Sequence, residues 1–363
     1  MGSVVSFRDR INRFFYRNII KRICFKLDAE NVHNFFIKAG KFLGRHFLTK
    51  KAVSLAFYYQ RPILEQDILG IHFKNPVGLS AGFDKNAELV DILGDVGFGF
   101  AEIGSITARA CEGNKGKRLD RVSKDRSLWV NFGLNNKGVK EIVSRLNGRE
   151  ANIPLGISIA KTNCKETVNV QSGVEDYILS LIESKNIGNY IDLNISCPNA
   201  YGGQPFSNPK LYEMLLKEVY KLKIAKPVFV KLSPDLDKKA IDKILDISYK
   251  YKISGFVCSN LTKKHRFGNG GLSGKPVEEL ANNLLKYIYK KTKGDFLLIG
   301  VGGIFSAEDA YKKIRLGASL VELITGMIYN GPNIISEINR GLVRLLKRDG
   351  FSNIGEAVGA DLK

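Results

Sequence analysis

Several features are scarce in this sequence, and each scarcity excludes a class of protein. No run of about 18 apolar residues is present, so no membrane-spanning helix is predicted. The five cysteines lack CxxC spacing, which argues against a disulfide framework and against a zinc or iron–sulfur site. No secretory signal begins the chain, and the GxGxxG and Walker A patterns of nucleotide-binding proteins are missing. We therefore expect a protein without a bound metal, in the reducing cytoplasm.

The composition is that of a folded protein with a strong positive charge. The chain has 363 residues, of which 44% are hydrophobic and 25% charged, and this length fits two average domains or one α/β barrel with extensions. The net charge is +20, and residues 1–50 alone contribute +8. Such a charge suits nucleic acid or an anionic membrane. No RNA-binding motif accompanies it, so we do not expect a nucleic-acid partner.

The N-terminal segment mixes basic and large apolar side chains. From Ser6 to Phe25 this mixture predicts an amphipathic helix, and a second helical pattern follows Asp28. Arginines beside phenylalanines are typical of a helix in the interface of an anionic bilayer, whereas the alternative is a helical extension packed on a larger domain. The first six residues also fit the myristoylation pattern at Gly2, which so short a match can meet by chance.

Short apolar runs alternate with amphipathic segments from residue 76 onward. Eight such runs, each followed by a helical pattern, predict a (β/α)8 TIM barrel with an N-terminal helical extension. We place the extension at residues 1–50 and the barrel at 51–363, with a doubly wound sheet as the alternative. The expected strands are 76–82, 99–104, 155–160, 190–196, 227–232, 254–259, 296–301 and 318–323.

Polar residues and glycines crowd the C-terminal ends of these runs, where barrel enzymes keep their active sites. Gly302 and Gly303 end one run, and Thr325-Gly326 follow the next. Barrels hold a phosphate on backbone N–H groups in such an arrangement, although a glycine cluster can also simply serve packing.

Three reactive side chains stand at the same expected edge. Cys197 follows the run 190–196 between two amides, where it could take or donate a proton, although a lone cysteine is more often a buried hydrophobe. Lys85 and Lys231 each follow apolar residues. A lysine in that setting can be a fixed positive charge beside a flavin or carboxylate, or can extend its ammonium to solvent.

Together these residues resemble the dihydroorotate dehydrogenase family, from about residue 27 to the C-terminus. The N-terminal helices with "LDAENVH" resemble the quinone-dependent, membrane-associated class 2 in particular. The other matching stretches are "NPVGLSAGFDKNAE", "GFGFAEIGSIT", "GNKGKRLDR", "FGLNNKGV", "DLNISCPN", "VFVKLSPDL", "GGLSGKP", "IGVGGIFSAEDAYKKIRLGASLVE" and "GFSNIGEAVGADL".

The resemblance implies oxidation of (S)-dihydroorotate to orotate for pyrimidine synthesis, with FMN on the barrel and a quinone as electron acceptor. It implies Cys197 as the base and a quinone tunnel that includes His33 and Arg121. The implied substrate-binding residues are Lys85, Asn131, Asn194, Asn199 and Asn260. The implied FMN-binding residues are Ser80, Ala81, Gly82, Lys85, Ser105, Ser158, Asn194, Lys231, Ser259, Gly274, Gly302, Gly303, Thr325 and Gly326. It also implies a peripheral protein on the cytoplasmic side of the inner membrane. The sequence leaves open which quinone is used and the oligomeric state.

Some positions depart from the class 2 pattern. Class 2 members usually have serine as the base, and the Cys197 loop resembles the soluble class 1 instead. Val130 stands in register with a substrate asparagine, unless Asn131 replaces it with a shift of one residue. Leu261 replaces a threonine, Ser158 an asparagine near the flavin, and Ile324 a tunnel tyrosine. Losing hydrogen-bonding groups around a polar anion weakens its binding. The alternative is therefore an FMN-dependent paralogue that acts on a different cyclic amide or unsaturated ring.

Overall fold

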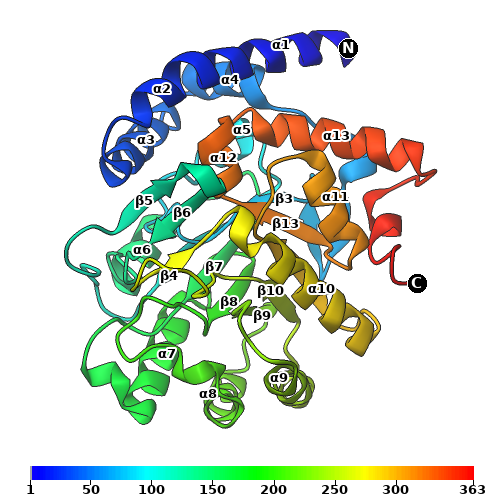
Figure 1. Ribbon diagram of the computed structural model, residues 1–363. Helices are drawn as coiled ribbons and strands as arrows, with labels where there is room; N and C mark the ends of the chain where they lie inside the picture. Colours follow the sequence, from blue (N-terminus) through cyan, green and yellow to red (C-terminus); the bar gives the residue numbers. More distant parts are fainter. Residues whose placement is uncertain (1) are drawn as a thin grey trace.

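All eight apolar runs form strands, and the strands close into a parallel barrel in the computed structural model, which describes residues 2–363 (Figure 1). The closed barrel confirms the predicted fold and excludes the doubly wound sheet. Seven of its eight strands are buried along their whole length, as expected where helices cover the outer face. The strands, in their order around the barrel, are β10 (Gly255–Cys258), β12 (Leu297–Val301), β13 (Leu320–Leu323), β3 (Val77–Leu79), β4 (Phe100–Ile106), β7 (Leu155–Ile159), β8 (Tyr190–Asn194) and β9 (Val228–Leu232).

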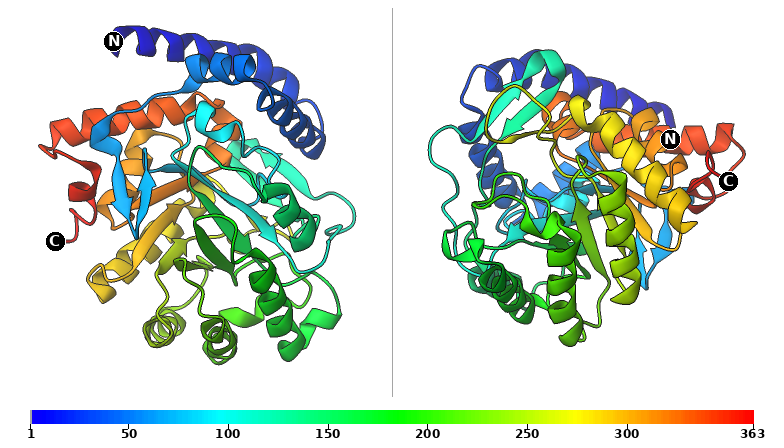
Figure 2. Two further views of the ribbon diagram at one scale, coloured as in Figure 1. Left: turned by 180° about the vertical axis from the view of Figure 1, so that it is seen from behind. Right: turned by 60° about the horizontal axis from the view of Figure 1, so that its bottom comes forward.

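Helices surround the barrel, and several begin at a side chain that caps the first turn. The side chains of Asn169, Asn208, Asp237 and Ser306 each accept a hydrogen bond from a backbone N–H of the helix that follows. Figure 2 shows the helices on the outside of the barrel in two further views. They are α5 (Leu93–Val96), α6 (Val139–Leu146), α7 (Val170–Ser184), α8 (Pro209–Lys221), α9 (Lys238–Lys250), α10 (Glu278–Thr292), α11 (Ala307–Arg315), α12 (Thr325–Asn330) and α13 (Ile334–Arg348).

The inside of the barrel is built in two layers of opposite character. The lower layer is an apolar floor, to which the hairpin of β1 (Gln66–Ile68) and β2 (Ile71–Phe73) contributes Phe73. Its buried members are Phe73, Phe100, Tyr190, Phe229, Val257, Ile299 and Leu320. Four strands carry a second inward-facing residue two positions after their residue in the apolar floor. These four residues are charged or acidic: Glu102, Asp192, Lys231 and Glu322. We call these four residues the polar layer; it lies between the apolar floor and the C-terminal ends of the strands.

A small antiparallel sheet, not predicted from the sequence, lies in the loops above the barrel. It has the order β11 (Gly271–Leu272), β6 (Ser127–Val130) and β5 (Leu119–Val122). Helix α3 contacts this sheet, where Glu30 forms an ion pair with Arg118. The sheet and α3 together form a wall above one side of the barrel.

The N-terminal segment is helical, as predicted, and forms four helices. They are α1 (Gly2–Phe15), α2 (Lys21–Cys24), α3 (Ala29–Leu43) and α4 (Phe47–Phe57), with a wide π turn at Tyr16–Ile20 between the first two. The Asp28 side chain caps α3 by accepting from the N–H of Asn31 at 2.9 Å. Helix α4 was not predicted. It includes residue 50, so it crosses the expected boundary between the N-terminal extension and the barrel. The myristoylation pattern includes Met1, which lies outside the described residues.

Helix α1 packs on the barrel through polar groups rather than apolar ones. Asp9 is fully buried and pairs with Arg340 at 3.2 Å and with Arg8 at 2.9 Å. Its carboxylate also accepts a hydrogen bond from the hydroxyl of Ser336, on α13. The large apolar side chains of α1, including Phe7 and Phe14, are instead exposed. Among residues 2–363, no helix is both long enough and apolar enough to cross a bilayer.

Candidate active site

Two adjoining cavities lie at the C-terminal ends of the barrel strands. They comprise about 540 and 940 Å³ of space, open solvent at their mouths included, and they share lining residues that include Ala81, Lys231 and Asn260. We call the first the glycine cavity and the second, which extends beneath α3 and the small sheet, the asparagine cavity. This edge of a barrel is where enzymes of this fold place their chemistry.

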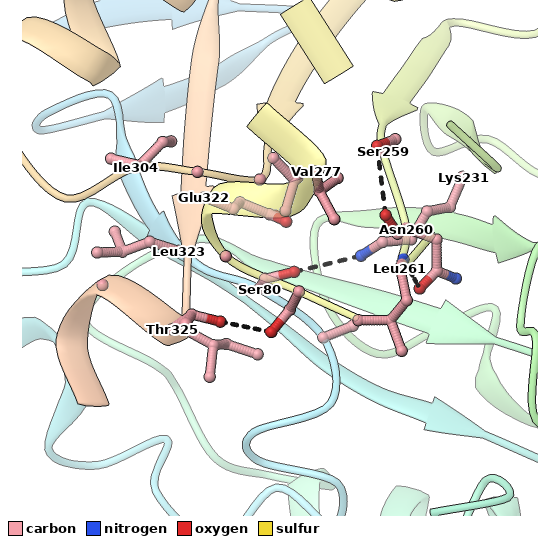
Figure 3. A pocket seen from close by; sticks show the side chains of 18 residues that line it. Ser80, Lys231, Ser259, Asn260, Leu261, Val277, Ile304, Glu322, Leu323 and Thr325 are labelled. Carbon is pink, nitrogen blue, oxygen red and sulfur yellow. Dashed lines mark hydrogen bonds between the residues drawn. The ribbon is translucent and has the colours of Figure 1, made fainter. Parts of the chain in front are cut away.

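Several glycines form part of the lining of the glycine cavity (Figure 3), at positions where a side chain would collide with neighbouring atoms of the protein. Gly302 and Gly303 follow β12 with φ values of +105° and +77°, which L-residues rarely adopt. A Cβ on Gly326 would lie 2.1 Å from the carbonyl oxygen of Ile304, and one on Gly274 would lie 2.4 Å from that of Arg126. The bare backbone can therefore approach a flat or anionic ligand closely, which fits a phosphate-bearing cofactor.

The polar layer forms the base of this site. Lys231 donates to Glu102 at 3.3 Å and to the Ser80 hydroxyl at 3.3 Å, and both members of the ion pair are buried. Burial lowers the pKa of Lys231, but the surrounding carboxyl groups, led by Glu102, outweigh that effect and raise it. Lys231 is therefore a fixed positive charge at the base of the cavities.

Four asparagines line the asparagine cavity, and three of them, Asn194, Asn199 and Asn260, were predicted from the sequence. Asn194 donates to Ser105 at 2.8 Å, and Asn260 donates to the Asn194 side-chain oxygen at 3.1 Å. Asn199 donates to the backbone oxygen of Val130 at 3.0 Å. The other polar atom of Asn199, Oδ1, is buried without a hydrogen-bond partner. A buried acceptor of this kind fits an N–H donor of a bound ligand.

Cys197 lies beside these amides in the same cavity. Burial raises the pKa of its thiol to about 11, although the N–H of Asn199 and the ammonium of Lys161 counteract burial. The thiol is therefore protonated near neutral pH. To act as a base, it must lose its proton or gain a more favourable environment when a ligand binds.

Lys85 and His33 meet at the opposite wall of the asparagine cavity. The Lys85 ammonium donates to Nε2 of His33, 3.3 Å away, and lies 3.7 Å from the ring centroid of Phe132. Burial lowers the pKa of Lys85 to about 8. Burial and then the charge of Lys85 lower the pKa of His33 to about 3, so that the imidazole is neutral. A ligand carboxylate would give this poorly hydrated lysine a partner of opposite charge.

The structure brings most of the predicted site residues to the two cavities. The glycine cavity has Ser80, Ala81, Lys231, Ser259, Gly274, Gly302, Gly303, Thr325 and Gly326 in its lining. The asparagine cavity has His33, Gly82, Lys85, Ser105, Asn194, Cys197, Asn199 and Asn260 in its lining.

Three predicted residues lie outside the linings of both cavities. Asn131 accepts a hydrogen bond from Asn114 at 2.8 Å, while Val130 takes the place in the cavity wall. Ser158 is buried beneath the site, between Ser105 and Asp192. Arg121 donates to the carbonyl oxygen of Leu27 at 2.8 Å and lies over the ring of Phe25.

The sequence prediction missed other lining residues. Glu322 lines the glycine cavity, and Asn135 and Phe132 line the asparagine cavity. The sequence could have indicated Glu322, because an acidic residue within the expected buried strand 318–323 is unusual and points to a functional role. Asn135 and Phe132 lie in a loop whose course depends on the unpredicted small sheet, so nothing in the local sequence indicated their position.

Comparison with known proteins gives one consistent result. The family model described as dihydroorotate dehydrogenase matches residues 63–346. A "Dihydroorotate dehydrogenase (quinone)" of Haloarcula marismortui is 40% identical over 82% of this chain and 86% of its own length. One from a Roseiflexus species is 36% identical over 94% of this chain and 97% of its own.

A solved structure is similar over nearly the whole chain. The crystal structure of DHODH from Eimeria tenella in complex with ferulenol superposes with a TM-score of 0.83 at 28% identity. It covers 93% of this chain and 96% of that one. The covered share is larger than residues 51–363, so the similarity includes at least part of the N-terminal segment.

Proposed function

The chain belongs to the dihydroorotate dehydrogenase family, and from that premise we propose how its residues carry out the oxidation of dihydroorotate to orotate with a quinone as electron acceptor. This reaction is a step of pyrimidine synthesis. The observation that carries the proposal is the meeting of Cys197, the asparagines and Lys85 in one cavity, next to the glycine cavity above Lys231.

Proteins of this family are flavoproteins, and we propose FMN as the cofactor. The glycine cavity would hold its phosphate on the N–H groups around Gly303 and Gly326, and Lys231 would lie beside its ring. When bound, FMN would accept the hydride of the substrate and pass the two electrons on to the quinone. The bare backbone and the fixed charge at the base of the cavity are what this group requires.

The substrate would lie in the asparagine cavity, above the ring. The unpartnered Oδ1 of Asn199 would accept from a ring N–H, and Lys85 would pair with the carboxylate. Cys197 would take the proton from C5 while the hydride leaves C6. Asn194 and Asn260, already bonded to each other, would hold the ring in place. We assign Asn131 no contact with substrate, because it is bonded to Asn114.

The quinone would enter between the N-terminal helices and the small sheet. The wall of the asparagine cavity is apolar there, and neutral His33 is its polar member. Arg121 would act from behind that wall, since it fixes the connection between α2 and α3. The apolar lining comprises Leu119, Leu128, Val130, Phe132, Ile324 and Ile328.

The same helices would bind an anionic membrane surface. Phe7, Phe14, Phe35, Phe47 and Leu48 are each at least 60% exposed, and ion pairs of Asp9 and Arg13 fix the opposite face of α1 to the barrel. An apolar outer face beside arginines is typical of interfacial helices. We place the protein on the cytoplasmic side of the inner membrane, in keeping with five free cysteines.

A second candidate keeps the flavin and changes the substrate. Val130 and Leu261 give the asparagine cavity apolar walls, which would also accept a less polar cyclic amide or unsaturated ring. Steady-state kinetics separate the two candidates: orotate should accumulate only when dihydroorotate and a quinone are both supplied. Absence of orotate from a flavin-loaded preparation would favour the second candidate.

A further inference from the structure

Glu322 has an unusual position for an acid. It projects inward from β13 in the polar layer and forms part of the lining of the glycine cavity (Figure 3). Its side chain is fully buried, and neither carboxyl oxygen forms a hydrogen bond of normal geometry, although the Ser80 hydroxyl lies near it. A buried polar group in this condition requires an explanation, because leaving it unpaired is costly.

The positive charge nearest to Glu322, that of Lys231, is already paired with another acid. Lys231 is the one cation in the polar layer, and it pairs with Glu102 at 3.3 Å. The fourth member, Asp192, accepts a hydrogen bond from Ser158 at 2.9 Å. Burial raises the pKa of Asp192 well above its ordinary value. An ionised Glu322 would therefore be an uncompensated negative charge inside the barrel.

The surroundings favour the neutral form of this carboxyl group. Burial, and next the charge of Glu102, raise the pKa of Glu322 well above its ordinary value, while Lys231 acts in the opposite direction. A protonated carboxyl has an O–H to donate. Because the side chain lines the glycine cavity, the bound cofactor is where that O–H can find an acceptor.

We propose that Glu322 is a neutral carboxylic acid that donates a hydrogen bond to the polar edge of the flavin ring, next to the ammonium of Lys231. This inference rests on the proposed flavin cofactor. With Glu322 and Asp192 both neutral, the polar layer holds one cation and one anion, and its net charge is zero. Glu322 then binds the ring without adding a negative charge that would oppose its reduction.

Infrared difference spectroscopy of the flavin-loaded protein, oxidised against dithionite-reduced, tests the proposal directly. We expect a C=O band of a protonated carboxyl that shifts on flavin reduction, moves in D2O and disappears in Glu322→Gln. Asp192→Asn is the matched control: it is equally buried but absent from the cavity linings, so the shifting band should survive. A carboxylate band lost in Glu322→Gln, or no band lost at all, would overturn the proposal.

Flavin retention provides a second readout. Glu322→Leu fills the space without a donor, so FMN should dissociate on the order of tenfold more readily, the effect of one hydrogen bond. Glu322→Gln keeps a donor and should retain FMN much better than the leucine variant; equal retention by the two variants would contradict the proposal. A wild-type protein that holds no flavin would overturn the proposed function as well. A flavin that dihydroorotate reduces, but that gives no Glu322 band, would overturn this inference alone.

Discussion

The ammonium of Lys231 lies 3.3 Å from a carboxylate oxygen of Glu102, in the interior of a closed barrel where Glu102 is fully buried and Lys231 is 5% exposed. Each charge is the other's main compensation, because burial raises the pKa of the remaining acids of the polar layer, Asp192 and Glu322, well above their ordinary values. The pair supports the cavity from below, and it keeps a cation at the position where a reduced flavin requires one.

Replacing one member of this pair should therefore reduce the stability of the fold more than replacing both. We expect Lys231→Met to lose flavin and to lower the free energy of unfolding by about 3–5 kcal/mol, the cost of leaving a buried charge alone. The double variant Lys231→Met with Glu102→Gln should recover part of that stability but not the flavin. Denaturant unfolding and flavin content measure the two effects, and additive losses would show that the two side chains are not coupled.

The base should have a pH dependence set by its thiol. The pKa of Cys197 is raised to about 11, so the deprotonated fraction grows as pH rises through the alkaline range. The rate of flavin reduction by dihydroorotate should therefore climb from pH 7 towards pH 10. Cys197→Ser, whose hydroxyl is a weaker acid, should be slower throughout this range, and Cys197→Ala slower still. A wild-type rate that is flat over this range would contradict the assignment.

The apolar wall next to Asn199 should limit substrate affinity. Val130→Asn places an amide at this wall, and we expect the KM for dihydroorotate to fall by up to about tenfold, the contribution of one hydrogen bond. Val130→Ala is the matched control, since it removes volume without adding a donor or acceptor. A KM that rises in Val130→Asn and not in Val130→Ala would favour the alternative substrate.

His33 should stabilise the fold only where its ring is neutral. Its folded pKa of about 3 lies below the ordinary value of 6.5, so the unfolded chain binds more protons between these two pH values. The stability that His33 contributes is thus fully present above pH 6.5 and is lost as pH falls towards 3. The difference in Tm between wild type and His33→Leu should shrink over that range. A Tm difference that stays constant between pH 6.5 and pH 3 would contradict this account of His33.

Membrane binding should depend on the outer face of the N-terminal helices. Replacing Phe14 and Phe35, which are 61% and 64% exposed, by serine should weaken binding to anionic vesicles at least about tenfold, because each phenyl ring contributes apolar area. Replacing the exposed Tyr249 and Phe267, which lie elsewhere on the surface, is the control. Equal effects of the two pairs in a vesicle flotation assay would contradict the assigned surface.

The barrel was predictable because its signals are local. Each strand is a short apolar run, and the residues that end these runs, from Lys85 to Gly303, meet at one edge in any parallel barrel. The polar layer also left a trace in the sequence, since Glu102, Asp192 and Glu322 interrupt apolar runs.

The choice between Val130 and Asn131 was not predictable, because it depends on long-range pairing. Side chains of a strand alternate between faces, so the register of β6 sends Val130 to the cavity and Asn131 away from it. Strand β11, which fixes one edge of that sheet, has only two residues, too few for a periodic pattern. Tertiary pairing decides such positions, and a single sequence does not show it.

Anaerobic mixing with L-dihydroorotate tests the central assignment most directly. The flavin absorbance of the wild-type protein should bleach rapidly and return when a quinone is added, whereas Cys197→Ala should bleach far more slowly with its flavin content intact. A flavin that dithionite bleaches and dihydroorotate does not would contradict dihydroorotate as the substrate. Equal rates in wild type and Cys197→Ala would contradict Cys197 as the base.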